Sequence, residues 1–240
     1  MRNIIIVMAS ALIAGAAYAQ PSAFVSDENT VALWNFDEGE GPITRDAGPI
    51  GIHLRYNERG DRKPDETPPK WVRGKFGKAL LFNGDLRQTL WNAADSFKKF
   101  FGLKDAITFE AWVKPEDPPA PKNMGFFQNM EYSKNGFRIN FSAGFNVGWQ
   151  LQDGKGEVVI NSKKGLPPGV WSHFACTYDG TVMRIYINGV LDTEKPINGC
   201  IIQSRSDGIS IAYTGGYPFF YGAIDSIRIS KIARTEFKVE

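Results

Sequence analysis

The sequence is poor in the features that most metal, nucleic-acid and membrane proteins need. Two histidines and two cysteines occur among 240 residues, without a C-x-x-C spacing, so a Cys/His zinc site has little support. Lysine and arginine number 28 against 26 aspartate and glutamate, and the basic residues are scattered, which argues against a nucleic-acid partner. The longest apolar run falls short of the roughly 18 residues of a spanning helix, so we expect no membrane span.

That apolar run is instead typical of an export signal. Arg2 supplies a short basic region, Ile4 to Ala17 a hydrophobic stretch, and Ala17-Tyr18-Ala19 a small-residue cleavage site. We expect cleavage at Ala19-Gln20 and a secreted or periplasmic product. A membrane anchor is the alternative, but the apolar run is short and polar sequence follows it.

Cys176 and Cys200 are the two cysteines. An exported chain with an even number of cysteines favours a disulfide, so we expect these two to pair. The alternative is two separate buried thiols that pack as small hydrophobic side chains.

The chain also lacks sustained 3.6-residue periodicity and shows many short alternating segments between turn residues, which predicts an all-β sandwich. Strands are expected at Val31–Phe36 and Ala79–Phe82. The polar, proline-rich stretch Asn57–Lys70 predicts a long surface loop, and one short helix is expected between Asp95 and Gly102. Asp179-Gly180 and Asn188-Gly189 are hairpin dipeptides, so a three-stranded meander is expected around them.

Seven segments carry a family resemblance: "ALWNFDEGEG", "RDAG", "GKFGKALLFNG", "ITFEAWVKPE", "GVWSHFACTYDG", "MRIYINGVL" and "GAIDSIRISKIAR". Their order and spacing resemble the laminin G-like domains of the concanavalin A-like lectin/glucanase superfamily. The resemblance implies a two-sheet antiparallel jelly-roll β-sandwich with adjacent first and last strands. It divides the chain into a signal peptide (1–19), an N-terminal lead (20–30), the domain (31–234) and a C-terminal tail (235–240).

Alternation in the last expected strand places Asp225 on the same face as Ile227 and Ile229, where an ion needs a partner. The resemblance implies a structural Ca²⁺ in this region. The expected ligands are Asp225, Asp46 and either Asp37 or backbone oxygens near it. The alternative is that Asp225 accepts hydrogen bonds from backbone N–H groups of the first strand, or pairs with Arg45, and needs no metal.

Motifs for catalysis are missing. Jelly-roll glycosidases carry paired carboxylates on one strand face, whereas Glu110 stands alone in "TFEAW". The resemblance indicates that His173 is structural, and no G-x-S-x-G elbow occurs. We therefore expect no enzymatic activity. A polysaccharide lyase or glycoside hydrolase is the alternative, with Arg138, Gln150 and Gln152 as residues that a lyase face would use.

Binding is the function that the resemblance favours, with a glycan, a glycoprotein or another protein of an extracellular assembly as partner. Aromatic residues in glycine-rich loops are candidates for stacking on sugar rings. The candidates are Tyr217, Phe219, Phe220, Tyr221, Phe126 and Phe127. The alternative is that the 215–222 loop folds back over the end of the sandwich. A purely architectural subunit of a cell-surface assembly is the third class considered.

Overall fold

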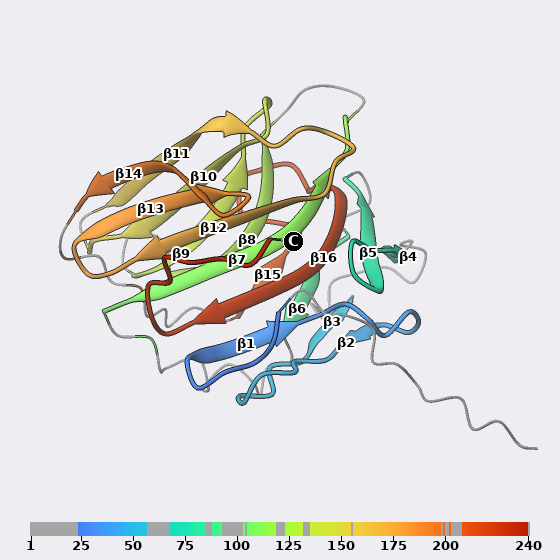
Figure 1. Cartoon of the computed structure of the whole chain (residues 1–240). Helices are drawn as coiled ribbons and strands as arrows, with labels where there is room; N and C mark the ends of the chain where they lie inside the picture. Colours follow the sequence, from blue (N-terminus) through green and yellow to red (C-terminus); the bar gives the residue numbers. More distant parts are fainter. Residues whose placement is uncertain are drawn as a thin grey trace, which may run out of the picture.

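The computed structural model describes residues 24–56, 68–84, 88–92, 103, 105–118, 123–131, 135–154, 156–197, 199, 202 and 208–239. These residues form sixteen strands and no helix, arranged as two antiparallel sheets packed face to face (Figure 1). The predicted all-β jelly-roll sandwich is confirmed. The expected helix between Asp95 and Gly102 and most of the expected loop Asn57–Lys70 lie outside the described residues.

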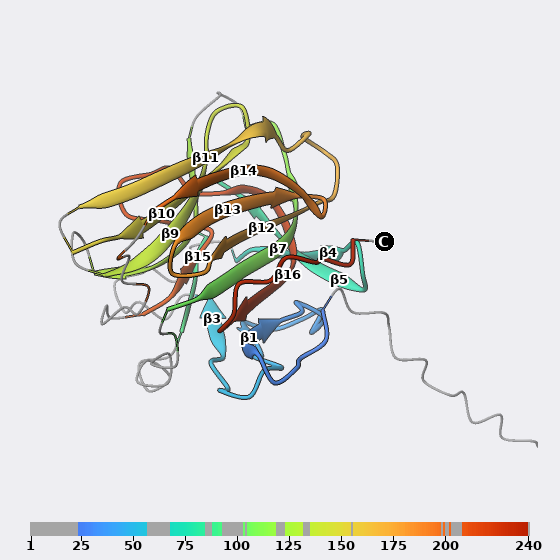
Figure 2. The ribbon, with the colours of Figure 1, turned by 60° about the vertical axis from the view of Figure 1, so that its left-hand side comes forward.

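Sheet A contains, in spatial order, β14 (Val190–Pro196), β13 (Val182–Ile187), β12 (Ser172–Tyr178), β7 (Ile107–Pro115), β16 (Tyr221–Ser230), β5 (Lys78–Asn83) and β4 (Lys70–Arg73), with β1 (Thr30–Trp34) also paired to β16. Sheet B contains β11 (Glu157–Gly165), β10 (Asn146–Gln152), β9 (Asn135–Phe141), β8 (Met124–Glu131), β15 (Ser210–Ile211), β6 (Leu90–Asn92), β3 (Leu54–Tyr56) and β2 (Ile43–Thr44). Figure 2 shows β9 to β11 stacked against β12 to β14.

The core lies between the inner faces of the two sheets and is rich in phenylalanine. Phe109 of β7 contacts Phe127 of β8 with ring centroids 4.7 Å apart, and stacks on Phe174 of β12 at 6.0 Å. These side chains point inward because alternate residues of a strand face the same side of a sheet. β7 carries large apolar side chains on its outer face as well. There Trp112 packs in a second, smaller apolar cluster with Phe24.

The first and last strands are adjacent, as the resemblance implies: Trp34 pairs with Ile227 and Leu33 with Arg228 (Figure 1, blue beside red). However, a bulge between Ile224 and Ser226 interrupts the pairing of β16 with β7. A bulge inserts one extra residue and resets the alternation of side chains. Ile224 and Ile227 therefore both belong to the core, and the expected face-sharing of Asp225 with Ile227 is corrected.

The predicted meander is present as β12, β13 and β14. Asn188 and Gly189 both have positive φ, at 47° and 77°, as a type I′ turn requires. The other turn differs, because three residues separate β12 from β13 and only Gly180 among them has positive φ. There the Asp179 carboxylate accepts the backbone N–H groups of Thr181 and Val182.

The described segments before β1 and after β16 pack against the outer face of sheet A. Phe24 is buried ahead of β1, and Phe237 contacts the rings of His173 and Tyr186 after β16. The C-terminal segment crosses in front of this sheet in Figure 1. The packed body therefore extends on both sides of the range 31–234.

Cys176 is a free thiol buried in β12, and Cys200 lies outside the described residues. The expected Cys176–Cys200 disulfide is therefore not supported, and Cys176 follows the alternative of a buried hydrophobic thiol. Burial raises the pKa of this thiol well above its ordinary value, so Cys176 is unreactive. Within the described part of the chain, no helix has the length and apolar character needed to cross a bilayer.

Candidate functional site: the polar outer face of sheet B

A row of polar side chains runs across the outer face of sheet B. Ser210 of β15 pairs with Gln128 of β8, Gln128 with Arg138 of β9, and Arg138 with Gln150 of β10. Directly opposed residues of antiparallel strands share a face, so these side chains point away from the phenylalanine core. Neighbouring positions add Asn140, Gln152 and Glu157 to the same face. The sequence pattern of β9 and β10, apolar alternating with polar, produces this arrangement.

Arg138 lies at the centre of the row and donates hydrogen bonds to two of its neighbours. Its Nε donates to Gln150 Oε1, and its Nη2 lies 3.0 Å from Glu157 Oε2. The Tyr217 ring covers the guanidinium, with its centroid 5.2 Å from Arg138 Cζ. Since Arg138 is 7% exposed, its charge is neutralised locally by Glu157, as a buried cation requires.

Several polar atoms of this face have no partner although they are buried. They are Asn140 Nδ2, both amide atoms of Gln152, and Glu157 Oε1. The Gln152 side chain has no exposed surface and Asn140 is 5% exposed. A buried polar group left without a hydrogen bond costs about 1–3 kcal/mol, so such atoms indicate a place that water or a ligand occupies.

The loop 212–220 crosses this face. Thr214 Oγ1 donates to Asn140 Oδ1 at 2.6 Å, and the Gly215 N–H donates to Gln128 Oε1 at 2.8 Å. Tyr213 and Phe219 stack with centroids 4.8 Å apart, and both remain half-buried, as does Tyr217. The loop thus folds back over the sandwich, the alternative considered above, while it keeps three rings at the surface.

The six aromatic residues expected to bind a ligand therefore separate into three groups. Phe126, Phe127 and Phe220 are completely buried in the core, and these three are corrected. Phe126 and Phe127 are both inward because a bulge between Gly125 and Phe127 adds a residue to β8. Tyr217 and Phe219 lie at the polar face, while Tyr221 begins β16 and packs against the core.

Asp225 and Asp37 lie at a different place, inside sheet A, where the neighbour of β16 changes from β5 to β1. Asp225 Oδ2 accepts the Phe76 N–H at 2.8 Å, and Asp37 Oδ1 accepts the Lys78 N–H at 2.9 Å. Burial and the nearby Asp37 raise the pKa of Asp225 to about 6. Gly74 lies so close to Asp225 that a Cβ there would meet the carboxylate.

Asp46 does not join that pair. Its carboxylate accepts the N–H groups of Leu33 at 2.8 Å, Gly48 at 2.6 Å and Ile52 at 2.8 Å. Asp46 is therefore held by backbone N–H groups, one of them from the first strand. For Asp225 the alternative is corrected in its partner, because the backbone donor is Phe76 and not a residue of the first strand. Within the described ranges, no group of three or more histidine, cysteine, aspartate or glutamate side chains is arranged to hold a metal. The expected three-aspartate ligand set is thus reduced to Asp225 and Asp37.

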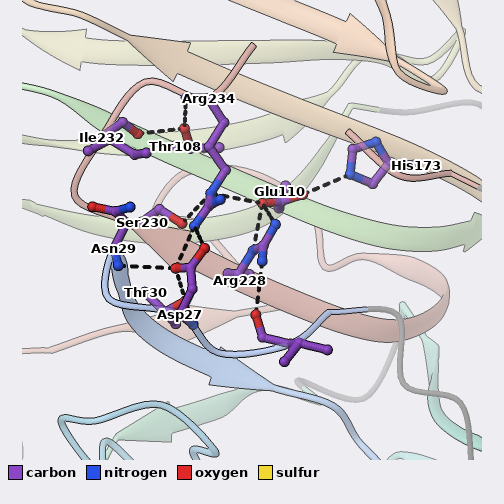
Figure 3. A network of polar contacts seen from close by, with 11 residues as sticks. Asp27, Asn29, Thr30, Thr108, Glu110, His173, Arg228, Ser230, Ile232 and Arg234 are labelled. Carbon is purple, nitrogen blue, oxygen red and sulfur yellow. Dashed lines mark hydrogen bonds and ion pairs between the residues drawn. The ribbon is translucent and has the colours of Figure 1, made fainter. Parts of the chain in front are cut away.

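A charged network covers the outer face of sheet A (Figure 3). Glu110 Oε1 accepts from Arg228 Nε at 2.8 Å, and Glu110 Oε2 lies 3.2 Å from His173 Nε2. Arg234 Nη2 lies 2.7 Å from each carboxylate oxygen of Asp27. Burial by itself raises the pKa of Glu110, but His173 and Arg228 more than compensate and hold it below its ordinary value.

The contacts of this network are those of a structural pair, Glu110 and His173. The sequence analysis expected a structural role for His173 from the resemblance. Both side chains are almost completely buried, and the imidazole packs between the rings of Phe24, Trp112 and Phe237. The sequence analysis missed the role of Arg228 and Arg234. Arg228 lies in the last strand and Arg234 just after it, so these two basic side chains could have indicated a partner for the isolated Glu110.

Comparisons with known proteins agree with this architecture. Residues 92–240 match the laminin G model described as the concanavalin A-like lectin/glucanases superfamily. Mouse pappalysin-1 is 24% identical over 207 residues, which is 79% of this chain and 12% of that protein. The chain therefore spans about an eighth of the length of this curated relative.

Two solved structures share the fold. Domain 4 of AbnA, a GH43 extracellular arabinanase from Geobacillus stearothermophilus solved with arabinotriose, has a TM-score of 0.61 at 20% identity, covering 85% of this chain and 93% of that one. The binding domain of botulinum neurotoxin DC, solved with rat synaptotagmin II, has a TM-score of 0.61 at 11% identity, covering 86% and 49%. At these identities the likeness concerns the fold alone.

Proposed function

Because the chain belongs to the concanavalin A-like lectin/glucanases superfamily, we propose that it is an exported, non-catalytic binding module for carbohydrate, free or carried on a glycoprotein. The observation that carries the proposal is the outer face of sheet B, where buried amide and carboxylate atoms without partners lie beside half-exposed aromatic rings. Sugar-binding sites combine such polar groups with ring faces. The arabinotriose complex of AbnA domain 4 gives a precedent on this fold.

The absence of activity is part of the proposal. Glycoside hydrolysis needs two carboxyl groups on either side of the bond to be cleaved, and Glu157 is the one carboxylate among the described outward side chains of β8 to β11. Arg138, Gln150 and Gln152 do share this face, as the lyase alternative expects. However, Arg138 is already paired with Glu157, and His173 is buried on the other sheet.

A structural Ca²⁺ bound by Asp225 and Asp37 remains part of the proposed function. Two carboxylates near each other, one of them completely buried with a raised pKa, favour a hard cation that would neutralise both. Calorimetric titration of EDTA-treated protein with Ca²⁺ tests this site. If the titration releases no heat and Ca²⁺ does not raise the melting temperature, the Ca²⁺ site is ruled out.

A glycan array is the direct test of carbohydrate binding, followed by calorimetry with the best oligosaccharide. We expect binding that Gln152→Leu weakens, together with no release of reducing ends or unsaturated uronates from crude polysaccharides. Release of either product would establish the enzymatic alternative. Co-purification with envelope proteins without glycan binding would instead establish an architectural subunit. N-terminal sequencing of the exported protein tests cleavage at Ala19-Gln20.

A further inference from the structure

We infer that the outer face of sheet B selects uncharged, hydroxyl-rich glycans over glycans that carry carboxylates. This inference rests on the proposed function and concerns the chemical class of the ligand at the same site. It follows from two independent features. The first is which polar atoms are left without partners, and the second is that Arg138, the arginine beside them, is already hydrogen-bonded.

The atoms without partners are balanced between donors and acceptors. Asn140 Nδ2 and Gln152 Nε2 are donors, whereas Gln152 Oε1 and Glu157 Oε1 are acceptors. A hydroxyl group both donates and accepts, so a sugar hydroxyl can satisfy either kind, while a carboxylate only accepts. A ligand carboxylate placed against these atoms in the position of a hydroxyl would therefore leave Gln152 Oε1 and Glu157 Oε1 without partners. It would also bring a second negative charge beside Glu157.

The arginine is not available to compensate for that charge. Arg138 already uses Nε for Gln150 and Nη2 for Glu157, and Tyr217 covers its plane. Binding of a carboxylate by arginine draws its strength from two parallel N–H groups presented together, and the Nε–Nη2 edge of this guanidinium is occupied by Gln150 and Glu157. Arg55, also on the outer face, lies four strands from Arg138 in the sheet order, roughly 19 Å away.

Access to the site differs among its residues. Asn140, Gln150 and Glu157 keep some exposed surface, but Asn140 Nδ2 and Glu157 Oε1 are themselves buried, so a ligand reaches these two atoms only after a small shift of the side chains. Gln152 has none, and a hydroxyl that bonds to it must displace the side chains around it. Binding at Gln152 is for this reason the most demanding part of the inference.

The test uses matched glycans that differ only in a carboxylate: oligogalacturonides with and without methyl esters, and complex glycans with and without sialic acid. We expect the purified protein to bind the uncharged member of a pair about tenfold more tightly. Glu157→Gln should narrow that gap by strengthening binding of the acidic member, because it releases Arg138. Glu194→Gln is the matched control, since Glu194 also pairs with an arginine, Arg184, but on the other sheet.

The outcomes separate this inference from the proposed function. Binding of the acidic members in preference would overturn the selectivity and leave carbohydrate binding intact. No binding to any glycan would remove both. Gln152→Leu should weaken binding of the uncharged member about tenfold without lowering the melting temperature. If Gln152→Leu leaves binding unchanged, these amides hold water only and the site lies elsewhere.

Discussion

On the outer face of sheet A both carboxylate oxygens of Glu110 have a basic partner, whereas on the outer face of sheet B neither amide atom of Gln152 has any partner. The first face is covered by the segments before β1 and after β16, which supply Asp27 and Arg234 to its network. The second is crossed by the loop 212–220. A buried carboxylate with both oxygens paired indicates a structural role. Buried polar atoms without partners also occur on the outer face of sheet A, at His173 Nδ1 and Trp112 Nε1, so the contrast between the faces concerns Glu110 and Gln152 themselves.

The strongest way to break this comparison is to remove the charge of Glu110. Glu110→Gln leaves the half-buried Arg228 without its anion, and breaking this pair costs up to about 3 kcal/mol of unfolding free energy, the lower end of the range for completely buried pairs. We expect a fall in melting temperature of roughly 10 °C, with glycan affinity of the folded protein unchanged. Glu194 is an exposed partner of Arg184, so Glu194→Gln should change the free energy of unfolding by about 0.5 kcal/mol or less. A melting temperature equal to that of the parent would show that the network does not hold the fold together.

Asp225 sharpens the comparison, because this buried carboxylate of sheet A accepts hydrogen bonds from the Phe76 N–H and the Ser226 hydroxyl and not from a basic side chain. Burial and Asp37 raise its pKa to about 6. Its folded pKa exceeds its unfolded value, so the folded state binds the proton more tightly. Its stabilising contribution is therefore complete below about pH 4 and is lost as the pH rises through 6, by up to about 3 kcal/mol.

The measurement is urea unfolding between pH 4 and pH 7.5. The parent should lose stability over this window relative to Asp225→Asn, whose side chain does not titrate. Glu110 cannot mimic the effect, because its pKa is lowered and its contribution is lost only as the pH falls below its unfolded value. If Ca²⁺ binds, millimolar Ca²⁺ should abolish the loss at pH 7.5. A flat profile without metal would show that the Asp225 carboxylate is stabilised by groups other than a cation.

A smaller effect is expected where the same network reaches the surface. Asp27→Asn removes the charge that Arg234 binds through both oxygens, and the Arg234 hydrogen bonds outweigh burial to lower the pKa of Asp27 to about 2. Because Asp27 is about one-third exposed, solvent screening limits the loss to about 1 kcal/mol. Limited proteolysis should show faster cleavage ahead of β1. Glu28→Gln, at the exposed neighbouring residue, is the control and should leave the cleavage rate unchanged.

The sequence predicted the fold well because alternation and turn dipeptides are local signals. The meander of β12 to β14 and the inward side chains of β9 and β10 follow from them directly. The bulges at Gly125 and Ile224 do not, since each depends on pairing with a distant strand. For that reason the environment of Phe126 and Asp225 was predicted incorrectly, and the polar face was recognised only as three separate residues.

The smallest expected effect concerns the loop that crosses sheet B. Tyr217 is half-buried and stacks on Arg138, an interaction of about 0.5–1 kcal/mol. Tyr217→Ala should therefore lower the melting temperature by only about 1–4 °C, while it uncovers the guanidinium. Tyr217→Phe keeps the ring and is the control, and it should behave like the parent in both respects.

If loop 212–220 is part of the binding face, Tyr217→Ala weakens binding of uncharged glycans about threefold, by the loss of one stacking ring. It should at the same time bring acidic glycans closer in affinity, because an uncovered Arg138 can approach a carboxylate. Calorimetry with matched uncharged and acidic oligosaccharides measures both changes. If the loop only covers the end of the sandwich, Tyr217→Ala changes stability alone, and the contrast between the two faces reduces to a difference in how completely the chain covers each of them.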